Sequence, residues 1–560
     1  MKSLLALVLF AAVAHAGPTT RRVAVAPAAQ PKALPHHDGA HARVTFGQTN
    51  HAPREIVGRR DEPLTAEEDT AKQIQKLLRG PLHTGVTGLY VADAHTGESL
   101  FSVNADDALN PASNVKMIST ATALDLMGAD FRYSTRVLGP EPDLDGVIHG
   151  NIYLLGTWDP TLAASDLDEL ATQLAARGVH SLDGDVVIGA DPSRDGLYRP
   201  VIPIDIRAGQ PGELATASGP PGFDLVTFKV TARTAKTVQR PRLTYTAEAT
   251  RDAAGHARVM IVIGGTIGKG GALTYSLVTK EQTAAAAHFL RSALRTHQIG
   301  VTGDVTTAEL GDFIGDSVVD GELPVELARH DSEPLADIVR RVNKWSINWL
   351  ADRVIMTTAA LARHDVPTMA GALDAMYAWL DRRAPTAKGE DRPIVDTGSG
   401  LSYHTRITPH ELVAIVRGAA GFAPGADPSL AQAWMSSLSI GGTDGTLTRR
   451  FRTPEVRGRL HAKTGTLATA IALSGVLEVD PQRPLVFSIV TNGDRELSKG
   501  YVRRAHEQLV GLLCKYLAKT AKHPVAPPAI IPEVVHPSVP DDFEEADPTE
   551  QTLAKPLDAP

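Results

Sequence analysis

The chain has 560 residues, of which 43% are hydrophobic and 21% charged, as is ordinary for a soluble globular protein long enough for several domains. The formal net charge is −8, and residues 524–560 contribute −7 of it through eight acids and one lysine. The remaining body is therefore close to neutral, which excludes the basic footprint of a nucleic-acid-binding protein.

The two ends of the chain differ in composition from the body. Lys2 is followed by an apolar stretch from Leu4 to Val13 and by Ala14-His15-Ala16, which together predict an export signal at residues 1–16 that is cleaved off. The apolar stretch is too short to span a bilayer, which needs about 20 residues. Residues 17–65 predict a flexible basic linker, and residues 521–560 predict a disordered, Pro-rich acidic tail.

Between these ends, hydrophobic periodicity predicts a folded body that opens with a helix at 65–78, a strand at 87–92 and a helix from 110 to about 127. Short β-rich segments and two helices follow, at 185–188, 225–231, 258–263, 166–177 and 282–296. The body then returns to longer elements, with helices at 333–362, 369–382, 409–418 and 500–517 and strands at 460–466, 471–479 and 484–491. Strands at both ends with helices between them predict an α/β fold in which one domain, 66–135 and 329–520, is interrupted by a large β-rich insertion, 136–328.

Metal and cofactor chemistry finds little support in the sequence. Cys514 is the only cysteine and lies in an apolar helical pattern, so it is expected to be a small core residue. There is no cysteine zinc pattern and no His-Glu-x-x-His, and we expect no metal and no cofactor. The segment Gly264–Gly270 has the glycines of a phosphate loop, but no Ser or Thr follows its lysine, so a glycine-rich turn after the strand 260–263 is expected.

Ser113-Asn114-Val115-Lys116 is the first segment whose residue types suit catalysis. At the start of a helix, Ser113 and Lys116 share one face because they are three residues apart. The lysine can then take the hydroxyl proton, provided that burial or cationic neighbours lower its pKa, and the helix N-terminus favours developing negative charge. Taken alone, the segment also fits an N-cap serine followed by a surface lysine.

Two further segments suit the same chemistry. Ser346-Ile347-Asn348 lies at an expected break between helices, where a hydroxyl and an amide two residues apart can relay a proton and orient a substrate amide. The alternative is a polar pair at a helix junction. Lys463-Thr464-Gly465-Thr466 lies on an expected strand whose edge can bind an extended peptide. The lysine and the threonines would meet the terminal carboxylate of that peptide, and the glycine would let its backbone approach closely.

The order Ser-x-x-Lys, Ser-x-Asn, Lys-Thr-Gly is much more specific than any one segment, because it is the pattern of β-lactamases and penicillin-binding proteins. Over residues 70–518 the chain resembles the D-alanyl-D-alanine carboxypeptidase/endopeptidase group, the S13 peptidases or class C low-molecular-mass penicillin-binding proteins. The long interval between Lys116 and Ser346 fits the large insertion of this group. Four more segments carry the resemblance: Gly150–Leu162, His330–Leu335, Asp396–Ser402 and Gly442–Leu447.

The resemblance implies a β-lactamase/transpeptidase-like fold and an exported, periplasmic serine DD-peptidase that cleaves peptidoglycan stem peptides, needs no cofactor and is inhibited by β-lactams. It implies that Ser113 is the nucleophile, Lys116 the general base and Ser346 the relay of a proton to the leaving amine. Asn348 and Lys463 would hold the active-site network, while Thr464 and Thr466, on either side of Gly465, would bind the substrate carboxylate. The backbone N–H groups of Ser113 and Thr466 would form the oxyanion hole.

Three positions depart from the family pattern, and two other functions stay open. Ile347 replaces a polar residue and is expected to point away from the chemistry; Tyr403 stands where arginine is frequent, and Trp158 where glycine is common. One alternative is a β-lactamase, although no Glu-x-x-Leu-Asn segment directly follows Asn348. The other is a catalytically silent wall-binding scaffold. Asp396 and Asp444 occur in turn contexts and are expected to be structural, and the preference between carboxypeptidase and endopeptidase cleavage stays open.

Overall fold

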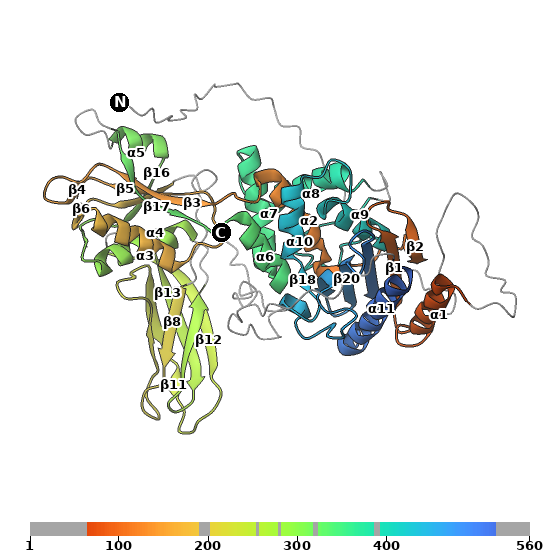
Figure 1. Cartoon of the computed structure of the whole chain (residues 1–560). Helices are drawn as coiled ribbons and strands as arrows, with labels where there is room; N and C mark the ends of the chain where they lie inside the picture. Colours follow the sequence, from red (N-terminus) through yellow and green to blue (C-terminus); the bar gives the residue numbers. More distant parts are fainter. Residues whose placement is uncertain are drawn as a thin grey trace, which may run out of the picture. The chain divides into compact units, whose positions relative to one another are not determined.

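The computed structural model describes residues 64–189, 202–253, 257–277, 282–316, 323–385 and 392–521 (Figure 1). The export signal expected at 1–16 lies outside the described residues, as do nearly all of the expected linker and tail. Within the described ranges, every helix is too short or too polar to cross a membrane.

A six-stranded antiparallel sheet is built from both ends of the body, in the order β18-β19-β20-β21-β1-β2. Its strands are β1 Val86–Asp93, β2 Ser99–Val103, β18 Ser439–Ile440, β19 Leu460–Thr466, β20 Ala470–Leu477 and β21 Leu485–Asn492. The pairing of β1 with β21 joins the beginning and the end of the body in one sheet. The expected α/β fold class, a sheet flanked by helices, is confirmed (Figure 1).

Helices cover both faces of this sheet, which is why all eight residues of β20 and of β21 are buried. Successive side chains on a strand point to opposite faces, so Leu473 and Phe487 pack on one core, and Ala472 and Val486 on the other. The first core includes helices α1 Ala66–Arg79 and α11 Lys499–Thr520. The second core is formed by α2 Lys116–Met127, α6 Leu335–Trp345, α7 Asn348–Arg363, α8 Met369–Arg383, α9 Pro409–Ala419 and α10 Pro428–Ser437.

The residues between α2 and α6 form separate sheets with a core of their own. A five-stranded sheet has the order β16-β7-β5-β3-β17, and smaller sheets join β15-β6-β4, β14-β8-β9 and β10-β13-β11 with β12 beside β13. The first strands are β3 Ser134–Gly139, β4 Val147–His149, β5 Ile152–Gly156, β6 Ser181–Asp183, β7 Val186–Gly189, β8 Ile202–Arg207, β9 Thr216–Ser218 and β10 Val226–Val230. The other elements are β11 Arg233–Thr234, β12 Arg242–Arg251, β13 Ala257–Ile267, β14 Ala272–Leu277, β15 Gly300–Val301, β16 Val305–Ala308, β17 Val325–Asp331, α3 Ala164–Ala176, α4 Gln282–Thr296 and α5 Leu310–Asp316.

One expectation for local structure is confirmed and another is wrong. The break expected at Ser346 divides the helical stretch 333–362 into two helices, α6 and α7, because Ser346 ends α6 in the left-handed conformation. The turn expected over Gly264–Gly270 begins later, since β13 continues to Ile267. At Gly265 a side chain would lie 2.1 Å from the Arg242 carbonyl oxygen of β12, so glycine is required by the close approach of two strands.

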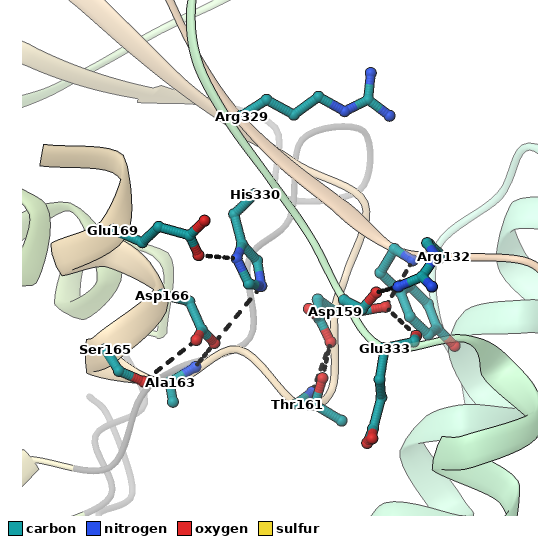
Figure 2. Close-up of polar contacts among 12 residues, drawn as sticks. Arg132, Asp159, Thr161, Ala163, Ser165, Asp166, Glu169, Arg329, His330 and Glu333 are labelled. Carbon is teal, nitrogen blue, oxygen red and sulfur yellow. Dashed lines mark hydrogen bonds and ion pairs between the residues drawn. The ribbon is translucent and has the colours of Figure 1, made fainter. Parts of the chain in front are cut away.

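The chain leaves the six-stranded sheet region before β3 and returns after β17 at neighbouring positions. The Ser332 N–H donates to the Tyr133 carbonyl oxygen at 2.9 Å, and the Tyr133 N–H donates to Ser332 Oγ at 3.0 Å. Arg132 Nη1 donates to the Ser332 carbonyl oxygen at 2.6 Å. Beside this crossing, His330 lies between Glu169 and Asp166 of α3, with its Nδ1 2.9 Å from Glu169 Oε2 (Figure 2). These contacts hold the two crossing segments together.

Asp159 closes a tight turn next to this crossing (Figure 2). Its Oδ1 accepts hydrogen bonds from the N–H and the hydroxyl of Thr161, at 2.7 and 2.6 Å. The preceding Trp158 has φ +63°, a left-handed conformation that glycine adopts most easily, which fits the expectation that glycine is common at this position in proteins that the chain resembles. Asp159 is 1% exposed, and this burial raises the pKa of its carboxyl group, against the two hydrogen bonds from Thr161.

Two substitutions of Asp159 are expected to distinguish the stability that its hydrogen bonds contribute from the cost of burying its charge. Asp159→Ala removes the acceptor of both Thr161 groups and is expected to cost about 1–3 kcal/mol of stability, while Asp159→Asn keeps that acceptor. Because the folded-state pKa is raised, the ionised carboxyl destabilises the fold above that pKa, and this effect disappears as the pH falls through it. The melting temperature of Asp159→Asn relative to the unsubstituted protein should therefore rise as the pH is raised from below 3.8, the ordinary pKa of this carboxyl group, to pH 8. A pH-independent difference would contradict this account.

Candidate active site

Ser113 lies in a 3₁₀ turn, Ala112–Val115, directly before α2, rather than in the first turn of the α-helix. A 3₁₀ helix has three residues per turn, so side chains three apart are eclipsed. Lys116 accordingly extends along Ser113, with its Nζ 3.0 Å from Ser113 Oγ. The spacing that the sequence offered therefore produces a direct serine–lysine contact.

The amine of Lys116 is fully buried and joins three segments. Besides Ser113 it donates to Asn348 Oδ1 at 2.6 Å and to the carbonyl oxygen of Ser399 at 2.8 Å. A neutral amine has two protons and one lone pair. If the protons stay with Asn348 and Ser399, the lone pair points at the Ser113 hydroxyl.

The turn that carries Ser113 is held by an asparagine pair. The Asn110 N–H donates to Asn492 Oδ1 at 2.7 Å, and Asn492 Nδ2 donates back to the Asn110 carbonyl oxygen at 3.0 Å. The Asn110 side chain accepts from the Ala112 N–H at 2.8 Å and donates to the Ser402 carbonyl oxygen at 2.8 Å. Ala112 has φ +47°, unfavourable for a residue with a Cβ, so these bonds stabilise a strained turn next to Ser113.

Ser346 and Asn348 lie on either side of the break between α6 and α7. Ser346 is left-handed, with φ +58° and ψ +37°, and Asn348 is the first residue of α7. Ser346 Oγ accepts from Lys463 Nζ at 2.7 Å, while Asn348 accepts from Lys116, so each of the two residues contacts one lysine. Ile347 packs against the hydrophobic core, as expected from its apolar side chain.

The third segment is the end of β19. Lys463 is fully buried, and its Nζ also donates to the Thr464 carbonyl oxygen at 2.9 Å. Thr464 Oγ1 donates to Thr446 Oγ1 at 3.0 Å, whereas Thr466 Oγ1 accepts from Arg503 Nη2 at 2.9 Å. At Gly465 a side chain would lie 2.4 Å from the Pro111 carbonyl oxygen, so this glycine lets β19 approach the turn that carries Ser113. The close approach seen here is within the protein, whereas the sequence suggested one to a ligand.

A buried ion pair lies beneath Ser346. Lys344, two residues before it, pairs with Asp444 Oδ2, and their side chains are only 8% and 10% exposed. Asp444 Oδ1 also accepts from the Ile440 N–H at 2.7 Å. Asp444 therefore has a structural role, as its turn context indicates. Asp396 likewise braces a loop, accepting from the Ser402 and Thr405 hydroxyls at 2.5 and 2.7 Å.

Sequence reasoning missed several residues around Lys116. Asp352 accepts from the Ser399 N–H at 2.7 Å, and burial raises the pKa of its carboxyl group against the opposing effects of Ser399 and Lys116. Its position, one helical turn after Asn348, was a signal that it lies on the same side of α7. Asn492 and Arg503 gave no such signal, because they are distant in sequence from the residues they contact.

Outside this site, Asp224, His288 and Asp304 bring potential metal-ligand atoms within 4.8 Å of one another. Arginines already occupy these carboxylates: Arg291 pairs with both acids, and Arg258 Nη2 lies 2.7 Å from Asp304 Oδ2. His288, Arg291 and nearby positive charges hold the pKa of Asp224 well below its usual range, against the effect of burial. The guanidinium groups supply the charge that a cation would supply, so the cluster is best described as an ion-pair network.

The sheet flanked by helices, with Ser-x-x-Lys, Ser-x-Asn and Lys-Thr-Gly segments in contact beside β19, defines the class of serine β-lactamases and penicillin-binding proteins. Within this class, the profile of the D-Ala-D-Ala carboxypeptidase 3 (S13) family matches residues 70–195 and 192–516. The chain belongs to this family.

Comparisons with individual proteins agree with this family assignment. The chain is 31% identical over 456 residues to a D-alanyl-D-alanine carboxypeptidase of Actinomadura sp., which covers 75% of this chain and 80% of the relative. It is 21% identical over 459 residues to the D-alanyl-D-alanine carboxypeptidase DacB of Haemophilus influenzae, covering 77% and 89%. The crystal structure of penicillin-binding protein 4 from Haemophilus influenzae matches with a TM-score of 0.59 at 20% identity, over 79% of this chain and 99% of that chain. The family and the fold that the sequence predicts are confirmed.

The Lys344–Asp444 pair is expected to be much more sensitive to single than to double substitution. Asp444→Ala or Lys344→Met leaves one charge buried without its counter-ion and should cost about 3–5 kcal/mol, whereas the double variant Lys344→Met/Asp444→Leu should regain most of this. The exposed pair Asp337–Arg340 on the same helix is the control, and its disruption should cost less than about 1 kcal/mol. Denaturant unfolding measures both pairs; additive losses at Lys344 and Asp444 would contradict the coupling.

Proposed function

We propose that the protein is a serine DD-peptidase that hydrolyses the D-alanyl-D-alanine bond of peptidoglycan stem peptides through an acyl-enzyme on Ser113. The observation that carries the proposal is the contact of Lys116 Nζ with Ser113 Oγ at 3.0 Å, with Lys116 also fixed by Asn348 and Ser399. A nucleophilic hydroxyl needs an adjacent base whose orientation is set by further groups. Membership of the S13 family and the name of the Actinomadura relative support this choice of substrate.

In the acylation step, Lys116 takes the proton of Ser113 while Ser113 Oγ forms a bond to the carbonyl carbon of the penultimate D-alanine. The backbone N–H groups of Ser113 and Thr466 stabilise the oxyanion of the tetrahedral intermediate. The carbon–nitrogen bond then breaks, and the leaving D-alanine amine receives a proton through Ser346. Lys463, 2.7 Å from Ser346 Oγ, orients this hydroxyl and contributes positive potential.

Hydrolysis of the ester regenerates Ser113, with Lys116 removing a proton from the attacking water. The same acyl group occurs in D-alanyl–diamino acid crosslinks, so endopeptidase cleavage uses the same machinery with a different leaving amine. A β-lactam acylates Ser113 in the same way, and its leaving amine stays attached to the acyl group, which slows release. Thr464 and Thr466 bind the carboxylate that is present both in the D-alanyl-D-alanine peptide and in the β-lactam.

The proposal also assigns the domains of the chain and its export. Residues 66–135 and 329–520 form the catalytic domain, and residues 136–328 form the insertion. The apolar stretch after Lys2 directs export to the periplasm, where peptidoglycan is found, with cleavage after Ala16.

Covalent labelling with a fluorescent penicillin tests the nucleophile. The unsubstituted protein is expected to carry one label on the peptide that contains Ser113, and Ser113→Ala is expected to carry none, because the attacking oxygen is gone. Ser436→Ala, which alters an exposed serine of α10, is the control and should label normally. A folded unsubstituted protein without label would overturn the proposed mechanism and favour the scaffold, and rapid turnover of the drug would favour a β-lactamase.

Replacing Lys116 tests the base. Lys116→Met fills a similar volume but has no lone pair for the Ser113 proton, so the rate constant of penicillin acylation is expected to fall by about 10²–10⁴. Lys72→Met, at an exposed position of α1, serves as the control. Stopped-flow quenching of protein fluorescence gives both rates, and circular dichroism verifies folding. A folded Lys116→Met variant with an unchanged rate would show that another group takes the proton.

A further inference from the structure

Arg503 reaches the end of β19 from the first turns of α11. Its Nη2 donates to Thr466 Oγ1 at 2.9 Å, and both side chains are partly buried. Thr464 and Thr466 are two residues apart on a strand, so their side chains lie on the same face. Their hydroxyl groups nevertheless have different partners, because Thr464 donates to Thr446 while Thr466 accepts from Arg503.

This difference decides which hydroxyl can donate to a ligand. A threonine hydroxyl has one proton and two lone pairs, and a guanidinium group has donors only. The bond from Arg503 uses a lone pair of Thr466 Oγ1 and leaves its proton available at once, whereas Thr464 must turn its proton away from Thr446 before it can donate to a ligand. Thr466 is therefore polarised as a donor toward an anion.

We propose that Arg503 is a positioning residue for the substrate carboxylate, acting through Thr466. The inference rests on the proposed function, in which Thr466 binds that carboxylate. Two hydrogen bonds that meet at one hydroxyl oxygen place the guanidinium about 5 Å from the bound carboxylate. At that distance an opposite charge stabilises the anion. Arg503 thus adds a positive charge to the subsite, independently of Lys463, which donates to Ser346 and to the Thr464 carbonyl oxygen.

The test compares two ligands that differ only in this charge. Benzylpenicillin carries a carboxylate next to the nitrogen of its reactive amide, and its methyl ester lacks the negative charge. Acylation of Ser113 by each is followed by intact-protein mass spectrometry, which measures slow single turnovers. The variants are Arg503→Gln, Arg503→Lys and the control Arg504→Gln, which removes the exposed arginine next along α11.

Arg503→Gln is expected to lower the acylation rate with benzylpenicillin about tenfold and to leave the rate with the ester unchanged, because only a charged ligand gains from the guanidinium. Arg503→Lys should recover part of the loss, and Arg504→Gln should change neither rate. Equal losses for both ligands would overturn the inference, since they would mean that Arg503 only supports β19; so would no loss for either. Unsubstituted protein that neither ligand acylates would instead overturn the proposed function, and the inference with it.

Discussion

The burial of the Lys116 amine constrains the whole site. A lysine that is fully removed from water must have its donors satisfied by the protein, and here the acceptors come from three separate segments: Ser113, Asn348 and Ser399. These segments are joined by chain that forms an entire additional set of sheets and several helices. The burial of Lys116 therefore requires the turn at Ser113, the break between α6 and α7, and the loop between α8 and α9 to meet at one point, which is the site itself.

Three lysines are buried around the site, and their different partners suit different roles. Lys344 is paired with the carboxylate of Asp444, so its charge is neutralised in place and it can hold Ser346 without taking part in proton transfer. The acceptors of Lys116 described above are hydroxyl, amide and carbonyl oxygens, which bond to an amine or an ammonium alike. Lys463 bridges Ser346 and the end of β19. Proton transfer at one lysine can thus occur beside two others that keep the geometry fixed.

Periodicity and local spacing could predict the parts of the structure that depend on neighbours in sequence. The strand 460–466 and the helix 282–296 lie where the hydrophobic pattern placed them, and the spacing of Ser113 and Lys116 brought them into contact. Strands of two or three residues, such as β15, contain too few side chains for any period to be visible. The 3₁₀ turn at Ser113 also escaped prediction, because the bonds that stabilise it come from Asn492, 382 residues from Asn110. Arg503 escaped for the same reason, since which way a helical side chain points over a sheet depends on tertiary packing.

Some of the segments that carried the family resemblance lie at the candidate active site, and others lie where the chain passes between the sheets. Ser113, Ser346 and Lys463 meet at the site, whereas Asp159 and His330 stabilise the place where the chain leaves and re-enters the sheet region. At that place Tyr133 and Ser332 are hydrogen-bonded to each other, so the first residue of β3 is paired with the last residue of β17. When both ends of an insertion are fixed side by side, the surrounding domain closes over the gap as it would over a short loop, and the entropic cost grows only slowly with the length inserted. Asp159 and His330 lie beside this crossing, so two of the segments that carried the family resemblance belong to the join between the sheets and not to the Ser113–Lys116 contact.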